Sequence, residues 1–461
     1  MCTLGNLVEF SVNASTSDHV KTAVKFARDH KLRLAIKNTG HDFIGRSTAK
    51  GGLGIWTRHL DSVTVFSYSS SAYSGPAIRM GAGVSAATVY ETIHKYGLRT
   101  LGGTCPTVGL AGGYTQGGGH GLLSSEKGLA ADNVLEWEIV TADGQLVTAS
   151  PFVNADLFWA ISGGGGGTFG VVTSMTTKLW PEGPTTGAVL SWNMTSTESF
   201  WDSYGVFQAG STVLVDSGST MLLSVTNSTV TATITAPLVD PVTLDSQLQY
   251  ITSYLNNSSI DYSLVIQQDP TFFEYFVRNF GPLPHGIWPT SHLIGSRLFP
   301  RSFFVSPTNI SALQLLAKNV TANNEWTISA VTLNVDHSVA GTMADYNSVN
   351  PAWRDTLVHF TVYSSWDYSM PFEVLYERSE RLTNQISPAL EALTPGSATY
   401  ANEANWNQTG WEDNFFGPNW ARLSSVKAKW DPDFVFNPRL SVGREQWAED
   451  EETGRLCKIQ I

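Results

Sequence analysis

The chain has 461 residues, more than one ordinary hydrophobic core supports, so two or three domains or one large α/β assembly are expected. It carries 28 Lys and Arg against 40 Asp and Glu, a net charge of −12, without any basic run. This balance argues against nucleic acids and anionic membranes as partners. No segment reaches the roughly 20 apolar residues that span a bilayer.

The first ten residues lack the basic start and apolar run of a signal peptide. Charged residues nevertheless make up only 15% of the chain, and eight N-x-Ser/Thr acceptor motifs occur. Both features favour secretion, although a sequence rich in Ser, Thr and Asn also produces such motifs by chance. The acceptors are Asn13, Asn193, Asn227, Asn256, Asn257, Asn309, Asn319 and Asn407.

Hydrophobic periodicity predicts short α/β units in the first part of the chain and mainly strands after residue 185. An amphipathic helix is expected over residues 18–30, a strand over 32–36, a helix over 86–96 and a strand over 134–140. Further strands are expected over 187–192, 220–225, 230–235, 327–335 and 358–363, and a helix over 372–382. A shift from glycine-rich to Ser/Thr-rich composition predicts a domain boundary near residues 181–184.

Glycines are densest in the segment LGGTCPTVGLAGGYTQGGGHG, residues 101–121. Bare backbone of this kind destabilises regular structure unless something packs against it, and its N–H groups bind phosphate and carbonyl oxygens. A large planar ligand is the natural candidate. A second run at residues 163–167 lacks the Lys-Ser/Thr of a phosphate loop, which argues against nucleotide triphosphate chemistry.

The segment GAGVSA, residues 81–86, matches a dinucleotide-binding fingerprint. That fingerprint needs an acidic residue about 20 positions later to hold the ribose. No Asp or Glu occurs between Glu91 and Glu126, so a nicotinamide site is not expected.

Three cysteines, Cys2, Cys105 and Cys457, are too few and too scattered for a zinc site or a disulfide framework. Cys105 by itself is compatible with a small buried apolar side chain. His41 follows a predicted buried strand in the loop IKNTGHDFIGRST, residues 36–48, and a lone histidine in a loop is usually a polar surface residue.

Several motifs taken together resemble the flavin-binding domain of the berberine-bridge-enzyme-like oxidases, in the vanillyl-alcohol-oxidase superfamily. These are NTGHDFIGRST, GGTCPTVGLAGGYTQGGGHG, GLAADNV and DLFWAISGGGGGTFGVV. The resemblance continues in NPAWRD, residues 350–355, and over residues 400–436, so it spans nearly the whole chain. It is nearest to the fungal branch that includes isoamyl-alcohol-oxidase-like proteins.

The resemblance implies an α+β fold, with a PCMH-type FAD-binding domain of two α/β subdomains and a substrate domain whose large antiparallel sheet is covered by helices. The expected domains are 1–183 for FAD, 184–398 for substrate, and 399–461 for a C-terminal segment that returns to the FAD domain. Relatives carry a signal peptide and a further α/β segment before CTLGN, so a truncated start is expected, with Cys2 left without its upstream partner.

In that family two covalent bonds hold the flavin, which places His41 on its 8α-methyl carbon and Cys105 on C6. A neutral imidazole and a thiolate are suitable nucleophiles for an electrophilic flavin. The loop expected to cradle the pyrophosphate contains Asn38, Thr39, Gly40, Asp42 and Gly45. The segments expected to line the cofactor contribute Gly109, Gly118, Gly119, Gly121, Asp132 and Val171. Val108 matches a position that gates oxygen, where valine accompanies oxidase rather than dehydrogenase behaviour.

Relatives supply a tyrosine base from a Y-x-N-Y-x-D motif, which here reads Tyr400-Ala401-Asn402-Glu403-Ala404-Asn405. Glu403 stands in the place of the base, and Asn402 is expected to touch the flavin. Glu403 serves as the base if it is desolvated, or else forms a salt bridge with Arg422 or Arg354.

Tyr114 stands where relatives often have a histidine near the flavin N1. It is expected either to donate a hydrogen bond to the reduced flavin or to be structural. His120 falls where plant relatives carry tyrosine, and is expected to pack under the flavin ring.

The expected activity is oxidation of an alcohol or secondary metabolite by O2 with release of H2O2, or oxidative cyclisation of a natural product, by a monomer. The alternative is an inactive, glycosylated family member that serves as a binding or scaffold protein. Six aromatic residues are candidates for the substrate wall, although aromatic residues more often belong to a core: Phe272, Phe273, Tyr275, Trp288, Trp353 and Trp366.

Overall fold

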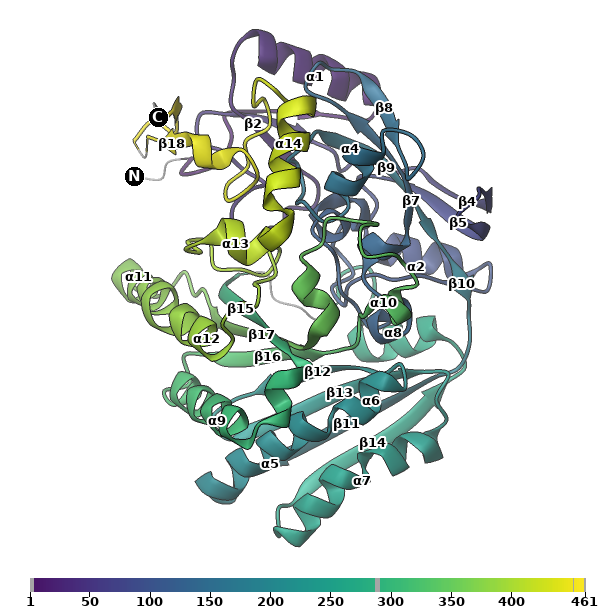
Figure 1. Cartoon of the computed structure of the whole chain (residues 1–461), viewed down its shortest axis with the longest axis vertical. Coiled ribbons are helices and arrows are strands. Elements are labelled where there is room, and N and C mark those ends of the chain that lie inside the picture. Colours follow the sequence, from purple (N-terminus) through teal and green to yellow (C-terminus); the bar gives the residue numbers. More distant parts are fainter. Residues whose placement is uncertain (1–3, 287–290, 451, 460–461) are drawn as a thin grey trace.

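The computed structural model describes residues 4–286, 291–450 and 452–459, so Cys2 and Trp288 lie outside the described residues. The chain forms two bodies stacked along the long axis of the molecule (Figure 1). The N-terminal third and the C-terminal segment build the upper body, and the middle of the chain builds the lower one. No helix in the described ranges has the length and apolar character needed to cross a bilayer.

The upper body begins with a small parallel sheet in the order β1-β3-β2. Its strands are β1 (Phe10–Asn13), β2 (Leu34–Lys37) and β3 (Leu53–Trp56), and helix α1 (Ser17–Asp29) connects the first two. The Thr16 side chain caps α1 by accepting the backbone N–H of His19 at 3.3 Å. The apolar stripe of α1, which includes Val20 and Val24, is buried, as expected for an amphipathic helix.

The second sheet of the upper body is antiparallel, in the order β4-β5-β9-β7-β8. Its strands are β4 (Val63–Ser69), β5 (Ser74–Gly81), β7 (Val134–Val140), β8 (Leu146–Ala149) and β9 (Val171–Lys178). Helices α2 (Ala86–His94), α3 (Ser124–Lys127) and α4 (Ala155–Ile161) accompany it, with the irregular turns η1 (Leu110–Tyr114) and η2 (Ala130–Asn133). The ladder β6 (Leu98–Arg99) with β10 (Trp180–Pro181) leads to the lower body.

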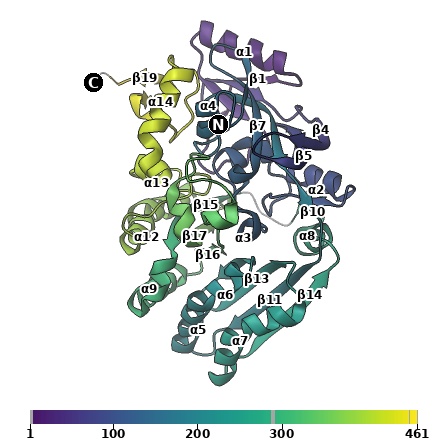
Figure 2. The ribbon, with the colours of Figure 1, turned by 45° about the vertical axis from the view of Figure 1, so that its right-hand side comes forward.

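The lower body is built on a seven-stranded antiparallel sheet in the order β14-β11-β13-β12-β16-β17-β15. Its strands are β11 (Thr185–Asn193), β12 (Thr220–Val225), β13 (Thr229–Pro237), β14 (Tyr262–Asp269), β15 (His292–Pro300), β16 (Thr327–Thr332) and β17 (Thr356–Ser365). One face is buried under helices, as the turned view in Figure 2 shows for α5 and α7. Its other face is directed at the upper body.

The helices of the lower body are α5 (Thr197–Gly210), α6 (Thr212–Asp216), α7 (Pro241–Asn257), α8 (Phe272–Phe280), α9 (Pro307–Thr321), α10 (His337–Ala340), α11 (Phe372–Arg381) and α12 (Ser387–Leu393). Short turns η3 (Arg301–Val305), η4 (Pro351–Asp355) and η5 (Leu382–Ile386) lie among them. The chain then returns to the upper body through α13 (Trp411–Phe416), η6 (Gly417–Asn419), α14 (Trp420–Trp430), η7 (Arg444–Gln446), β18 (Trp447–Glu449) and β19 (Leu456–Lys458). An ion pair of 2.7 Å between Arg33 and Glu449 fastens this end to the first sheet.

The expected fold class is confirmed, because a large antiparallel sheet is covered by helices and joined to a smaller α/β body. The strands expected over 134–140 and 220–225 have the bounds of β7 and β12. Two expected elements are shorter in the structure: the helix over 86–96 ends at His94, and the strand over 327–335 ends at Thr332. The expected division after residue 183 falls between β10 and β11.

Candidate functional site

A cavity of about 650 Å³ lies where the two bodies meet. The upper body contributes the loop after β2, from Asn38 to Phe43, and backbone of both glycine runs. The lower body contributes the open face of its sheet, and the C-terminal segment closes the cavity with Phe436, Asn437 and Pro438. All three parts of the chain therefore build one site.

His41 and Cys105 both line this cavity, although one lies in the loop after β2 and the other in the first glycine run. Thr107 links them. Its hydroxyl lies 2.7 Å from Nε2 of His41 and 3.4 Å from the sulfur of Cys105. Burial lowers the pKa of His41, which keeps its imidazole neutral and nucleophilic. If Nε2 donates to Thr107, Nδ1 of His41 keeps its lone pair for bond formation.

The two glycine runs meet backbone to backbone beside the cavity. A Cβ added to Gly166 would lie 2.8 Å from the Cα of Gly113, and one added to Gly109 would lie 1.9 Å from Nδ2 of Asn38. Larger residues would therefore push the backbone and the Asn38 amide apart. Such close-packed, side-chain-free backbone suits a planar ring system with phosphates.

Polar groups in the same wall fit the FAD that the sequence motifs imply. Oδ1 of Asn38 is buried and has no hydrogen-bond partner among the described residues, so it can accept from a ligand. Arg46 pairs with Asp42 at 2.6 Å and also donates to the carbonyl of Ala401. Asn402 donates to the carbonyl of Gly113 at 2.9 Å, which joins the C-terminal segment to the first glycine run.

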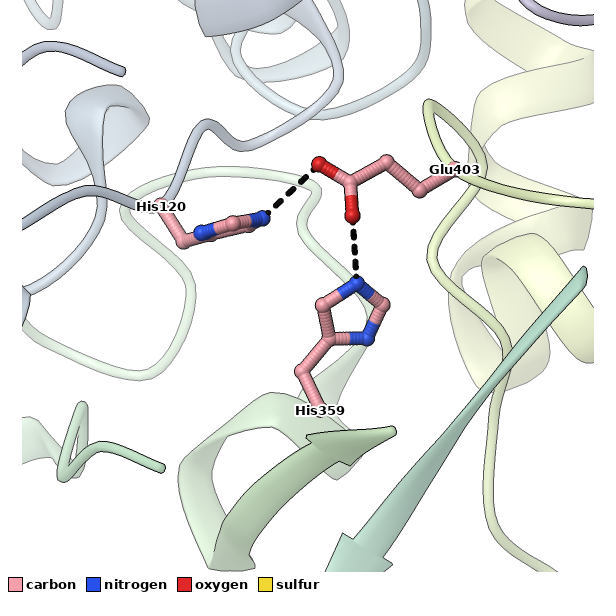
Figure 3. Close-up of side chains that lie close together, drawn as sticks. All are labelled: His120, His359 and Glu403. Atoms are coloured by element: carbon pink, nitrogen blue, oxygen red, sulfur yellow. Dashed lines mark hydrogen bonds and ion pairs between the residues drawn. The ribbon is translucent and has the colours of Figure 1, made fainter. Parts of the chain in front are cut away.

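Glu403 is clamped between two histidines (Figure 3). Nε2 of His120 lies 3.0 Å from its Oε1, and Nε2 of His359 lies 2.8 Å from its Oε2. The side chain of His359 is fully buried, that of His120 is 14% exposed and that of Glu403 is 27% exposed. His120 and Glu403 line the cavity, so only His359 is shielded from it among the three.

The charges of these groups follow from their surroundings. Burial raises the pKa of Glu403, but the charge and hydrogen bonds of the two histidines outweigh it and hold that pKa well below its ordinary value. Burial lowers the pKa of His359, and the hydrogen bond and charge of Glu403 offset this only in part. At neutral pH the cluster is therefore a carboxylate that accepts an N–H from each imidazole.

The three ligand atoms also lie within 4.8 Å of one another, as in some metal sites. Two features favour hydrogen bonding instead. Each imidazole contacts a different carboxylate oxygen, and Nδ1 of His359 is buried without a partner in the described ranges. A metal-bound histidine usually donates this second nitrogen to a carboxylate or carbonyl.

Tyr114 lines the cavity, but its hydroxyl donates to the carbonyl of His120 at 2.8 Å. Burial raises the pKa of Tyr114 well above its ordinary value, so the phenol stays neutral. This geometry favours the structural alternative, in which Tyr114 supports the turn that carries His120. Tyr400 has a comparable position, because its hydroxyl accepts the backbone N–H of Gly119 at 3.1 Å.

The structure brings most of the expected site residues into the cavity wall: Asn38, Thr39, Gly40, His41, Asp42, Cys105, Val108, Gly109, Tyr114, Gly121, Asn402 and Glu403. Other expected residues are not part of the cavity lining: Gly45, Gly118, Gly119, Asp132 and Val171. Gly118 and Gly119 have positive φ, and Val171 is buried in β9.

Asp132 is buried and pairs with Arg354 at 2.7 Å, which ties the η2 turn to the η4 turn. This corrects two expectations. Asp132 has a structural contact in place of a position in the cavity wall, and Arg354 is not the partner of Glu403. Arg422, the other expected partner, lies over the ring of Trp159 at 3.8 Å.

Of the two alternatives for the aromatic residues, substrate wall or core, the structure favours the core for those that it describes. Phe272, Tyr275 and Trp353 are buried in hydrophobic cores, Phe273 stacks on His94, and Trp366 packs against the core of the lower body. Ser, Thr and aliphatic side chains of the sheet line most of that side of the cavity, together with His292 and Tyr363.

Sequence reasoning missed the roles of Thr107 and His359 and gave His120 only a packing role. Thr107 lies inside the CPTVG motif, where its spacing of two from Cys105 was the available signal. The sequence around His359 gave no signal, because His359 lies in β17, whose residues have the pattern of a buried strand. Its contact with Glu403 depends on the fold.

Comparisons with known proteins agree with this site. Residues 8–150 match the FAD binding domain family, and residues 399–443 match the berberine and berberine like family. FAD-linked oxidoreductase ZEB1 of Gibberella zeae is 42% identical over 468 residues, which cover 100% of this chain and 80% of the relative. Bifunctional decalin synthase calF of Penicillium decumbens is 39% identical and covers 99% of this chain and 80% of the relative.

The crystal structure of the VAO-type flavoprotein MtVAO615 of Myceliophthora thermophila has a TM-score of 0.96 at 39% identity, covering 99% of this chain and 83% of that chain. A structure of berberine bridge enzyme, 18% identical with a TM-score of 0.77, shares the fold and covers 94% of this chain and 90% of that chain. The chain therefore belongs to the FAD-linked oxidoreductases of the vanillyl-alcohol-oxidase and berberine-bridge-enzyme-like family.

Proposed function

We propose that the chain is an oxidase whose FAD is bonded to both His41 and Cys105, and that it oxidises a small organic alcohol or secondary metabolite with O2. The observation that carries the proposal is the placement of both nucleophiles in the wall of one cavity, within hydrogen-bond reach of the same Thr107 hydroxyl. The same wall contains Glu403 and His120, so attachment and proton-transfer groups share one site.

Bound FAD supplies the two-electron acceptor for a hydride from the substrate carbon. The chain must take up the proton of the substrate hydroxyl. With Nε2–H of His120 donated to Glu403, Nδ1 of His120 is a free basic atom beside the carboxylate in the cavity wall. We assign the proton to this atom, while the Glu403 carboxylate holds the tautomer and stabilises the imidazolium that forms. Asn402 and Arg46 position the loops around the cofactor.

Val108 lies in the cavity wall, and its resemblance to the oxygen-gating valine of relatives supports an oxidase over a dehydrogenase. Transfer of electrons to O2 then releases H2O2. The name of one relative, a bifunctional decalin synthase, supports oxidative cyclisation as a second outcome. Hydride removal creates an electrophile, which a neighbouring group of the same substrate can trap.

Acid precipitation tests the cofactor part of the proposal. The purified protein is expected to be yellow, and the colour should remain with the precipitated polypeptide. His41→Ala and Cys105→Ala are each expected to keep covalent flavin through the remaining bond, whereas the double variant should lose it to the supernatant. A colourless precipitate from the unaltered chain would contradict covalent attachment.

Peroxide release across a panel of alcohols, sugars and aromatic metabolites tests the activity. A yellow protein whose reduced flavin does not react with O2 would indicate a dehydrogenase. A preparation that neither binds flavin nor turns over any member of the panel would favour the alternative of an inactive, glycosylated scaffold.

A further inference from the structure

The open face of the lower sheet carries a continuous row of hydroxyl side chains. Each of the seven strands contributes one Ser or Thr, and the cross-strand pairing places them in one register. In sheet order they are Ser263, Ser191, Thr231, Ser224, Ser329, Thr361 and Ser296. Directly paired residues of antiparallel strands project from the same face, so the hydroxyls form one line across the sheet.

This line is on the cavity side of the sheet. Thr231, Ser224, Ser329 and Thr361 line the cavity, whereas the alternate residues of the same strands are buried under the helices. Neighbouring strands lie about 4.8 Å apart, so the row extends for roughly 29 Å. We refer to these seven residues as the hydroxyl row.

A second row lies beside the first on the same face, two residues along each strand. It is aliphatic except for Thr233 and His359. In sheet order it consists of Val265, Val189, Thr233, Leu222, Val331, His359 and Leu298. We refer to it as the aliphatic row, and its His359 is the residue that binds Glu403. The two rows therefore form a floor that leads to the proton-accepting cluster.

Except at Ser224, burial of the hydroxyl row increases from β14 towards β17. Ser263 at the β14 edge is exposed, Ser191, Thr231 and Ser329 are half-buried, and Thr361 is buried. Ser224, in the middle of the row, is exposed. The floor is thus open to solvent at β14 and covered towards β17, where His359 and Glu403 meet. A long ligand can enter from the open edge with its leading end at the cluster.

The hydroxyls of the row differ in the partners that they already have within the protein. Ser191 and Thr231 bond to each other at 3.1 Å, and Thr361 donates to the carbonyl of Ser329. The hydroxyl of Ser296 is buried, and within the described residues it has no partner. Hydroxyls both donate and accept, so they suit the hydroxyl, carbonyl or ether oxygens of a ligand.

Charge and polarity define the ligand further. The sheet residues that line the cavity include no Asp, Glu, Lys or Arg among those described. A charged ligand buried on this floor would lack a counter-ion, and a ligand with hydroxyls on every edge would leave some unpaired against the aliphatic row. A ligand with oxygens on one edge and hydrocarbon on the other satisfies both rows.

We propose that the substrate of this site is a neutral, elongated aliphatic molecule that lies across the strands, with its oxygens on the hydroxyl row and its hydrocarbon on the aliphatic row. This proposal rests on the proposed oxidase function, because it places the oxidisable end of the molecule at His120 and Glu403. The two proposals can be tested separately, because this one requires only that the ligand bind to the floor, whether or not turnover follows.

Calorimetric titration of the flavin-loaded protein, with the flavin reduced beforehand and O2 excluded, tests the floor without turnover, because a reduced flavin accepts no hydride. The probes are dodecanediol, its dicarboxylate dodecanedioate, and the oligosaccharide cellotetraose. Dodecanediol is expected to bind at least about tenfold more tightly than either of the others. The dicarboxylate is charged and the sugar has no hydrocarbon edge, whereas dodecanediol is neutral and has one. Absence of dodecanediol binding, or tighter binding of the dicarboxylate or the sugar, would overturn the proposal.

Variants locate the binding. Thr231→Val combined with Thr361→Val removes two hydroxyls of the row that are three strands, roughly 14 Å, apart. This is close to the separation of the two terminal hydroxyls of dodecanediol, so the variant should weaken dodecanediol binding about tenfold or more. Leu222→Asn is expected to weaken it as well, by making the aliphatic row polar. Thr252→Val, on the outer helix α7, is the matched control and should bind as the unaltered protein does. Equal affinity in the Thr231/Thr361 variant and the control would contradict the assignment.

If dodecanediol binds but the reduced flavin does not react with O2, the oxidase function fails and the floor stands. If the protein oxidises other substrates while the row variants leave dodecanediol binding unchanged, the floor fails and the oxidase function stands.

Discussion

At the scale of single residues, Thr107 is the group that couples the two proposed attachment points. A hydroxyl between an imidazole N–H and a sulfur accepts from one and donates to the other. This arrangement sets the tautomer of His41 and directs the hydroxyl O–H at the sulfur of Cys105. Thr107 is therefore a positioning residue for the proposed flavin attachment.

Thr107→Val keeps the shape of the side chain but removes both hydrogen bonds. We expect covalent attachment of flavin to slow about tenfold, the effect of losing roughly one net hydrogen bond. The measurement is the fraction of flavin absorbance retained by acid-precipitated protein at increasing times after FAD is added to apoprotein. Thr107→Ser, which keeps the hydroxyl, is the control and should attach flavin normally. Equal attachment by both variants would show that the hydroxyl is unimportant.

The His120–Glu403 pair leads to a prediction about flavin reduction. Glu403→Gln removes the charge that holds His120, and His120→Asn removes the proposed proton acceptor. Each is expected to lower the anaerobic rate at which the alcohol substrate reduces the flavin about 100-fold or more, the range of general-base catalysis. The double variant should lose little more, because the two residues act as a unit. An unchanged rate in Glu403→Gln would remove the pair from the mechanism, provided that the flavin stays bound.

His359 predicts a dependence of stability on pH. Its pKa is lower in the folded protein than in the unfolded chain, because burial disfavours the imidazolium. The unfolded state then binds more protons as pH falls below about 6.5, so this residue contributes less stability there. His359→Gln keeps a donor for Glu403 without titrating, and should lose less stability than the unaltered protein between pH 7 and pH 5. Melting temperatures of both proteins across this range give the comparison, and parallel curves would contradict it.

At the scale of elements, periodicity located helices and strands better than it located their ends. The alternation in 220–225 and the apolar run in 134–140 correspond to β12 and β7 residue for residue. The helix expected over 86–96 ends earlier because the chain turns there, and Gly97 has a φ of +65°. The local hydrophobic pattern indicates which face of a helix or strand is buried, whereas the residue at which the element ends depends on the turn that follows.

The η2 and η4 turns are joined by an ion pair that the sequence did not indicate. Asp132 is fully buried, accepts from Arg354 through both oxygens, and also accepts from Asn347 at 2.7 Å. A buried carboxylate of this kind is costly if its cation is removed. Loss of the ion pair between Asp132 and Arg354 is therefore expected to destabilise the fold more than loss of an exposed ion pair.

Arg354→Met tests this contact. We expect it to lower the free energy of unfolding by about 3 kcal/mol, since it leaves a buried carboxylate without its counter-ion. Arg301→Met is the matched control, because Arg301 pairs with an exposed carboxylate, Asp216, and its loss should cost about 1 kcal/mol or less. Urea unfolding curves measure both. Equal shifts in the two variants would show that the buried pair contributes no more than an exposed one.

At the scale of the whole molecule, the site forms only where separate segments meet. His120 and Glu403 are 283 positions apart, and His359 reaches Glu403 from β17, the strand next to the edge strand β15. Motif recognition found the residues that a family motif contains, such as His41, Cys105 and Glu403. It could not find His359 or the hydroxyl row, because cross-strand register and the packing of two bodies are properties of the fold rather than of any local segment.

The positions of the acceptor asparagines bear on whether the protein is secreted and glycosylated. None of the eight is buried, and Asn257 at the end of α7 and Asn319 on α9 are exposed on the outer helices of the lower body. Those helices cover the sheet face opposite to the cavity, so glycans there would leave the site open. We infer that the protein enters the secretory pathway and is glycosylated on this side.

Expression behind a secretion signal in a fungal host tests the inference. The purified protein should lose mass on endoglycosidase treatment, and peptide mapping should find glycan at Asn257 or Asn319. Replacing both by Gln should reduce the mass without changing covalent flavin content, because neither residue lines the cavity. A secreted protein that carries no glycan, or a Gln variant that loses its flavin, would contradict the assignment of the outer helices as the glycosylated surface.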